Sequence, residues 1–322
     1  MTSTEMPGQQ EPAYAGFWRR LAAWMLDGLF LGAVGWILGL LMTDHLVALG
    51  GWGRLLGLIV AVTYFAMLDS HLGQGQSLGK RVMMIRVLGT SGQLLSPWQA
   101  GLRSVTVQLP YFLNGANFSL SWLNAWVVDP LWVLIIGIPL CQLFLSAFNR
   151  PSRQLIHDLL SQTVVVASEH RGAVRPSPLS GLQRLVCATL LALPAFVPLA
   201  AGMWTDLDKG DWKVLGPMHQ AVLALPGVTQ AQVGMGDGFR QTTQTGRTTW
   251  TYVSVRAYSR TSDIQNPSRL QAIALAILQA YPEGQQRDVL SVSLCHGYDI
   301  GIAAHENCEQ RNASPAEWLA GS

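Results

Sequence analysis

The sequence has little charge. Asp, Glu, Lys and Arg together make up 12% of its 322 residues, whereas a soluble domain carries roughly 25%. Hydrophobic residues reach 49% and there are 12 Trp, so much of the chain requires an apolar environment. This composition argues against an ordinary cytosolic enzyme. It also excludes a disordered chain, which would be poor in apolar residues.

Cysteine is also scarce, and catalytic motifs are missing from the more polar end of the chain. Four Cys are too few to form a small disulfide scaffold at this length. The last 119 residues contain no HExxH, CxxC, GxSxG or P-loop pattern. A net charge of +2 gives no basis for nucleic-acid binding. We therefore expect no enzymatic activity, no cofactor and no metal site.

The few charges are unevenly distributed. Residues 17–203 hold 18 charged positions in 187, whereas residues 204–322 hold 20 in 119. The first part therefore has the composition of a membrane domain, and the last that of a water-exposed domain with its own core. We predict the following organisation: an N-terminal tail over 1–16, a membrane domain over 17–168, a linker with the last transmembrane helix over 169–203, and a soluble domain over 204–322.

Long apolar runs indicate helices that cross a bilayer. A hydrocarbon core of roughly 30 Å needs about 20 predominantly apolar residues in a helix. Four stretches come near or exceed this length: 21–41, 52–68, 126–148 and 183–203. A fifth, 104–122, is interrupted by Pro and Asn residues and is ambiguous. The sequence thus predicts an α-helical polytopic bundle of about five transmembrane helices.

The basic residues suggest a topology. If 104–122 crosses and the N-terminus lies inside, the inner segments carry eleven Lys and Arg and the short outer loops carry only Arg54. This distribution follows the positive-inside tendency. We therefore expect a multi-pass protein of the plasma (inner) membrane with a cytoplasmic N-terminus and an extracytoplasmic C-terminal domain. Residues 114–117 could instead form only an outer loop.

Arg20 and Asp27 lie at the start of the first apolar run. They are seven residues apart, so they fall almost on one helical face. A carboxylate within a span should face the bundle interior and have a partner. Arg20 is roughly 10 Å away along the helix axis, so we expect that partner to come from another helix or loop. Two interpretations remain open, a structural polar contact between helices and an ion or proton site.

Two further polar segments follow the second and fourth spans. The first contains Asp69 and the basic pair Lys80 and Arg81, which we interpret as lipid-facing anchors. The second contains His157 and Asp158. Adjacent helical residues point about 100° apart, so a direct catalytic pair is not favoured there.

Both polar segments also contain β-like runs, Val82–Leu88 and Thr163–Ala167. These runs could pair into a small cytoplasmic platform. Ser96 followed by Pro97 is a typical helix start, with the serine as N-cap and the proline in the first turn.

Three blocks of sequence carry a family resemblance. They are YAGFWRRLAAWMLDGLFL at the first span, GQSLGKRVMMIRVL after the second, and RQLIHDLLSQTVVV after the fourth. In this order, over about residues 13–168, they resemble the RDD family of membrane proteins. The resemblance implies that Arg20, Asp27 and Asp158 are the residues that name the family, with Asp69 as the alternative second aspartate. It also implies a transport role, which has been proposed for some members.

The sequence pattern of the soluble domain predicts alternating helices and strands. We predict helices near 216–225 and 267–280 with Asn266 as an N-cap, strands near 228–235, 248–258, 288–296 and 299–304, and a final helical turn at SPAEWLA. This order suggests an α+β two-layer fold with helices on one face of an antiparallel sheet. Cys295 and Cys308 are thirteen residues apart, and in an oxidising compartment they could form a disulfide or remain two free thiols.

Two functions are consistent with these patterns. In the first, the bundle performs transport or ion- or proton-coupled exchange, with Asp27 binding the cation or proton and Arg20 offsetting its charge. In the second, the bundle is an anchor that presents an extracytoplasmic domain to a ligand or an envelope protein. The expected partners are the lipid bilayer, a possible second copy of the chain and that envelope protein, with no nucleic acid.

Overall fold

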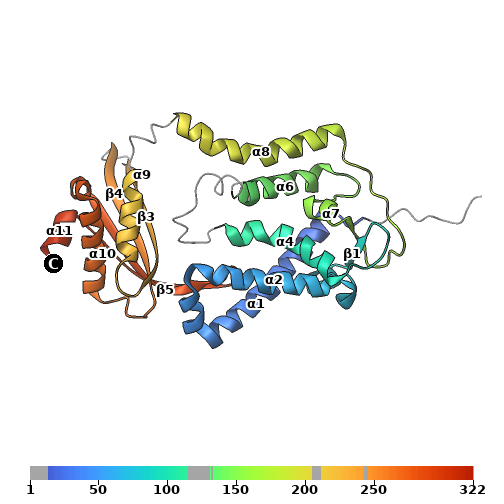
Figure 1. Ribbon diagram of the computed structural model, residues 1–322, viewed down its shortest axis with the longest axis horizontal. Helices are drawn as coiled ribbons and strands as arrows, with labels where there is room; N and C mark the ends of the chain where they lie inside the picture. The colour runs from blue at the N-terminus through green and yellow to red at the C-terminus, as the bar shows by residue number, and fades with distance from the viewer. Residues whose placement is uncertain (1–13, 115–130, 132, 205–211, 243–245, 322) are drawn as a thin grey trace, which may run out of the picture. The chain divides into compact units, whose positions relative to one another are not determined.

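The computed structural model describes residues 14–114, 131, 133–204, 212–242 and 246–321. Their contacts divide them into two compact units (Figure 1). The first unit draws its described residues from Met1–Val34, Leu56–Gly115 and Trp122–Pro198, and the second from Gly35–Leu55 and Leu199–Ser322.

Apolar helices make up most of the first unit. They are α1 (Phe17–Leu49), with an irregular backbone at Met42, α2 (Gly53–Leu68), α4 (Pro97–Leu113), the π-helical turn η3 (Val133–Gly137), α6 (Ile138–Phe148) and α8 (Gly181–Trp204). The end of α1, the start of α2, the end of α8 and the short helix η1 (Gly50–Trp52) between α1 and α2 belong to the second unit. Figure 1 shows α2, α4, α6 and α8 with roughly aligned axes. Large apolar side chains face outward, such as Leu29 at 71% and Leu143 at 65% exposure. An apolar outer surface suits lipid rather than water.

The number of clear membrane spans is smaller than expected. Among the described residues, one segment is long and apolar enough to cross a bilayer, the 52 residues Phe17–Leu68 that contain α1 and α2. The helix α4 has 17 residues and α6 has 11, and at 1.5 Å per residue even α4 extends only about 25 Å. The described helices therefore do not show about five spans. Residues 115–122 of the predicted stretch 104–122, and residues 126–130 and 132 of the stretch 126–148, lie outside the described residues.

A small two-stranded sheet adjoins the helices of the first unit, as predicted. Strand β1 (Ile85–Gly89) pairs antiparallel with β2 (Thr163–Ala167), with Ile85 opposite Ala167. The predicted run from Val82 starts too early because Val82 ends the short helix α3 (Leu78–Val82). The predicted N-cap is confirmed: Ser96 accepts a bond from the Gln99 amide at the start of α4.

Two short helices hold the polar segments beside this sheet. The 3-10 helix η2 (His71–Gly73) follows α2, and α7 (Ile156–Leu160) precedes β2. These elements place Asp69 and Asp158 at the same end of the first unit, next to the start of α1.

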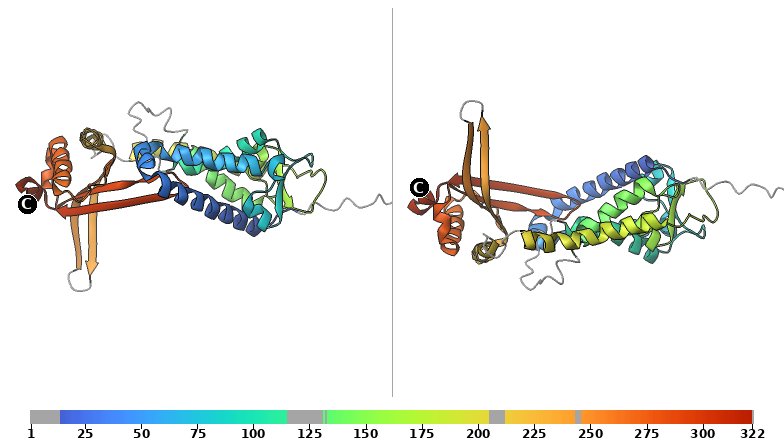
Figure 2. Two further views of the ribbon diagram at one scale, coloured as in Figure 1. Left: turned by 90° about the horizontal axis from the view of Figure 1, so that it is seen from below. Right: turned by 90° about the horizontal axis from the view of Figure 1, so that it is seen from above.

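The second unit contains the predicted α+β domain. Its elements are α9 (Trp212–Leu223), β3 (Val228–Thr242), β4 (Gly246–Ser259), α10 (Pro267–Ala280), η4 (Pro282–Gln286), β5 (Val289–Asp299), β6 (Ala304–Ala313) and α11 (Pro315–Ala320). Figure 2 shows α9 and α10 on one face of the sheet. Ile273 and Ile277 of α10 share a core with Val253 and Val292 of the strands, so the two-layer prediction is confirmed.

Two details of this domain differ from the prediction. The sheet order is β3-β4-β5-β6, and β4 and β5 are parallel, so the sheet is mixed rather than antiparallel. The reason is that α10 connects these two strands, and a helical crossover returns the chain in the same direction. The predicted strand 299–304 is a turn, because Asp299 accepts a bond from the Gly301 amide at 2.7 Å and Gly301 has a φ of +76°. Cys295 and Cys308 lie opposite each other on β5 and β6 and form a disulfide.

Candidate functional site

A cavity of about 580 Å³ lies within the first unit. Residues of α1, α2, α4, α6 and α7 contribute to its walls, which are mostly apolar. Charged side chains are nevertheless concentrated there: the described lining includes Arg20, Lys80, Arg103 and Arg153, together with Asp27, Asp69 and Asp158. Because charges in a membrane domain are rare and usually functional, this cavity is the candidate site.

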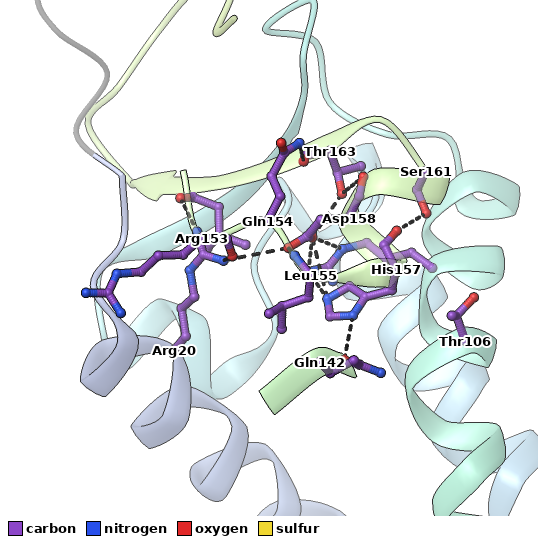
Figure 3. Close-up of polar contacts among 12 residues, drawn as sticks. Arg20, Thr106, Gln142, Arg153, Gln154, Leu155, His157, Asp158, Ser161 and Thr163 are labelled. Carbon is purple, nitrogen blue, oxygen red and sulfur yellow. Dashed lines mark hydrogen bonds and ion pairs between the residues drawn. The ribbon is translucent and has the colours of Figure 1, made fainter. Parts of the chain in front are cut away.

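Asp158 stands at the centre of the charged groups (Figure 3). Its side chain is fully buried, and Arg20 reaches it from α1 with Nη1 at 3.6 Å from Oδ2. The Arg20 guanidinium also donates to the carbonyl oxygens of Arg153 at 2.6 Å and Ser152 at 3.0 Å. Thr163 donates its hydroxyl to Asp158 at 3.1 Å. Arg20 therefore fixes the start of α1 to the segment around α7.

Arg103 connects this aspartate to Asp69. Its Nε and Nη2 donate to Oδ1 of Asp158 at 3.0 and 2.8 Å, and its Nη1 donates to Oδ2 of Asp69 at 3.2 Å. Lys80 then donates to both oxygens of Asp69 at 2.7 Å. Lys80, Asp69, Arg103, Asp158 and Arg20 thus form a series of alternating charges, called here the ion chain.

The ion chain includes one residue that the sequence reading missed and one that it misplaced. Arg103 was not singled out, although a single arginine near the start of an apolar run is a signal of an inward-facing charge. Lys80 was expected to be a lipid-facing anchor, but its side chain is only 12% exposed and its ammonium group binds Asp69. Arg81 is exposed and donates to the Gly73 carbonyl oxygen at 3.3 Å. The two differ because adjacent residues on α3 point about 100° apart.

His157 lies beside the ion chain and is held in one tautomer. Its Nε2 is 3.1 Å from Nη2 of Arg103, which can only donate, so Nε2 accepts. Its Nδ1 therefore carries the proton and donates to Oε1 of Gln142 on α6 at 3.0 Å. Nε2 is also 3.5 Å from Oδ1 of Asp158, so the neighbouring side chains do approach each other.

Burial and charge set the protonation states around α7. Burial lowers the pKa of His157 to about 3, against the attraction of Asp158, so the imidazole is neutral at physiological pH. Burial alone would raise the pKa of Asp158, but His157 and the guanidiniums of Arg103 and Arg20 outweigh it and hold the pKa well below its usual value. Asp158 is therefore a carboxylate and His157 a neutral hydrogen-bonding group.

Asp27 has a separate set of partners. Its Oδ1 accepts from the Tyr64 hydroxyl at 2.7 Å and the Gly79 amide at 2.8 Å, and its Oδ2 accepts from the Ser77 hydroxyl at 2.6 Å. The expectation that another helix supplies its partner is thus confirmed. Arg20 pairs with Asp158 instead, so the first arginine and the first aspartate of the run do not act as a pair.

Some polar groups of the cavity wall have no partner among the described residues. Ser104, only 4% exposed, has a buried hydroxyl oxygen without a hydrogen bond. Gln108 follows four residues later on the same face of α4 and is 9% exposed. Both line the cavity. A buried hydroxyl without a partner is unfavourable by roughly 1–3 kcal/mol, so an occupant that bonds to it would be stabilised.

Comparison with known proteins identifies the fold unit around this cavity. A sequence model described as the RDD family matches residues 14–162. The chain is also 28% identical, over 165 residues, to the uncharacterized membrane protein YteJ of Bacillus subtilis (strain 168); the match covers 48% of this chain and 81% of the relative. No solved structure matches this chain. Residues 14–162, somewhat less than half of the chain, therefore match the RDD family of membrane proteins, and this segment is called here the RDD domain.

Proposed function

We propose that the RDD domain transports a small polar solute through the helix bundle. The observation that carries this proposal is the cavity, because it combines room for a solute with a buried hydroxyl, that of Ser104, which has no hydrogen bond among the described residues. A purely structural bundle would gain stability from filling such a space with apolar side chains. Ser104 and Gln108 place polar groups against it instead.

The ion chain supplies a means of coupling a solute to helix movement. Its five members come from α1, the end of α2, α3, α4 and α7. If any one of these elements moves, its charged residue must leave one partner and pair with another. Such a change of ion pairs is typical of a transition between two discrete conformations. A solute that contacts the chain in only one conformation would shift the balance between them.

The proposed topology has a cytoplasmic N-terminus, about five crossings and an extracytoplasmic C-terminal domain. The positive-inside distribution supports it, since Arg54 is the only basic residue of the predicted short outer loops. The disulfide between Cys295 and Cys308 also supports it, because such bonds persist mainly in oxidising compartments.

Flux into proteoliposomes tests the transport proposal. We would reconstitute the full chain and compare a panel of small anions, cations and neutral solutes with empty liposomes. Gln108→Leu removes a cavity amide, and Thr106→Val is the matched control on α4, because its hydroxyl bonds only to the Leu102 carbonyl oxygen of its own helix. If the protein is a transporter, the wild type should give measurable flux of at least one solute. Gln108→Leu should reduce this flux at least tenfold, and Thr106→Val should change it by less than twofold.

A different result would favour the anchor function. If no solute enters faster than into empty liposomes, while deletion of residues 205–322 abolishes the cellular phenotype, the bundle serves to present the C-terminal domain. Reconstituted protein that elutes as a single species would show that the absence of flux is not a consequence of misfolding.

A further inference from the structure

We infer that the solute of the cavity is an oxyanion, a carboxylate or a phosphate, rather than a metal cation or a proton. This inference rests on the proposed transport function and names its substrate class. It follows from which hydrogen-bonding groups of the wall are already used.

Each oxygen of the three aspartates already accepts a hydrogen bond. Asp27 accepts three hydrogen bonds at 2.6–2.8 Å and is 1% exposed. Asp69 accepts from Lys80 and Arg103. Asp158 accepts from Arg103 and Thr163 through Oδ1 and from the Leu155 amide through Oδ2 at 3.2 Å. A hard cation needs several free oxygen ligands, and binding one here would require breaking charged contacts first.

Donors of the wall, in contrast, remain available. The Ser104 hydroxyl has no partner within the described part of the chain. Gln142 uses its carbonyl oxygen for His157. Its amide group, on a residue of the cavity lining, has no hydrogen-bond partner among the described residues and can donate. The guanidinium of Arg153 has five N–H groups and donates one of them to the Ser146 carbonyl oxygen at 3.0 Å.

The charges of the cavity lining also favour an anion. Among the described residues of the lining, four basic side chains face three aspartates, and His157 is neutral. The ion chain ends on a cation at both ends, Lys80 and Arg20. An anion bound at the Lys80 end continues the alternation, whereas a cation there would stand beside a like charge. At the other end the Arg20 guanidinium already donates to four carbonyl oxygens. Charge-assisted bonds from guanidinium or ammonium groups to an oxyanion are among the stronger ones in proteins.

A salt series on the purified full-length protein in neutral detergent tests this inference. Thermal stability is measured in sodium acetate and sodium phosphate against sodium chloride, and in lithium, sodium, potassium and choline chloride, all at one ionic strength. Acetate or phosphate should raise the melting temperature in proportion to the logarithm of its concentration. The four chlorides should give equal values. A shift confined to one metal cation would overturn the inference.

Variants place the effect in the cavity. Ser104→Ala and Arg153→Gln should each reduce the oxyanion shift by at least half, whereas Arg81→Gln, an exposed control, should preserve it. Equal shifts in all variants would mean surface binding and would refute the cavity assignment. Each variant's melting temperature in chloride alone shows whether it has folded.

The oxyanion could be a free solute or a lipid headgroup, and vesicle lipid distinguishes the two. A shift produced by phosphatidylglycerol but not phosphatidylcholine, without any from free acetate or phosphate, identifies the headgroup of an anionic lipid. The transport proposal can fail separately. Oxyanion binding without flux leaves the inference standing and refutes transport, whereas flux of a metal cation without oxyanion binding does the reverse.

Discussion

Replacing Asp158 with Asn should severely destabilise the first unit. The side chain is fully buried and forms ion pairs with Arg103 and Arg20. The neutral amide therefore leaves Arg103 with Asp69 as its carboxylate partner and leaves Arg20 with none among the described residues. Removing one partner from a buried ion pair lowers stability by roughly 3–5 kcal/mol. For a domain of 150–250 residues each kcal/mol shifts the melting temperature by about 2–4 °C, which gives roughly 6–20 °C.

The assay is the loss of the monodisperse peak in size-exclusion chromatography after heating in detergent. Asp299→Asn is the matched control, because this carboxylate pairs with Arg54 at 2.7 Å but is 42% exposed. Such pairs contribute only about 0–1 kcal/mol, so the control should shift by less than about 4 °C.

A double-mutant cycle separates the ion pair from other effects. Asp158→Asn combined with Arg103→Gln removes the charge that the single substitution leaves unpaired. The double variant should therefore lose less stability than the two single variants lose in sum. Recovery should be partial, since Arg103 also holds Asp69. If Asp158→Asn shifts no further than Asp299→Asn, or if the two changes simply add, the ion chain is not the structural element described here.

Four other changes have expected outcomes. Asp27→Asn replaces an oxygen that accepts a hydrogen bond by an amide that donates. The protein should still insert into the membrane, but its free energy of unfolding should fall by roughly 1–3 kcal/mol, measured by thermal denaturation; unchanged stability would contradict the three bonds. His157 has a pKa lowered to about 3, so its stabilising contribution is present above about pH 6.5 and is lost as the pH falls; wild type should lose roughly 2 kcal/mol more than His157→Gln between pH 7 and 5, and equal losses would argue against a buried neutral imidazole. A Cβ added by Gly79→Ala meets the Ala23 carbonyl oxygen, whereas one added by Gly28→Ala meets nothing within 4 Å, so only the former should reduce the yield of folded protein. Removing the disulfide by Cys295→Ser and Cys308→Ser should lower the stability of the C-terminal domain by about 3 kcal/mol, measured by proteolysis of the full chain in urea; no change would mean that the disulfide does not contribute.

Sequence patterns predicted the elements whose signals are local. Ser96, Asn266 and the run Thr163–Ala167 each carry a capping or β-forming signal within a few residues, and the structure has them at these positions. The mixed sheet was not predictable in this way, because strand direction depends on which strands pair across α10.

The candidate site was predicted in its residue types but not in its pairing. Arg20 and Asp27 were singled out as charges at the start of an apolar run, and Asp158 as a member of a polar segment that resembles the RDD family. Their partners depend on contacts over as many as 138 residues, such as that between Arg20 and Asp158, and helical periodicity contains no information about such contacts. Arg103 illustrates the limit, since its importance comes only from bridging two aspartates that are far apart in sequence.

The central claim is that the cavity in the RDD domain admits small solutes from water, and the reactivity of Ser104→Cys tests it most directly. In a variant with Cys141 and Cys187 replaced by Ser, the folded protein would be treated with a small, charged thiol reagent. The control is Leu145→Cys, a fully buried position on α6 that does not line the cavity. We expect Ser104→Cys to react at least tenfold faster than the control, and faster with an anionic than with a cationic reagent after correction for their rates with a free thiol. Equal, slow reaction at both positions would contradict the account.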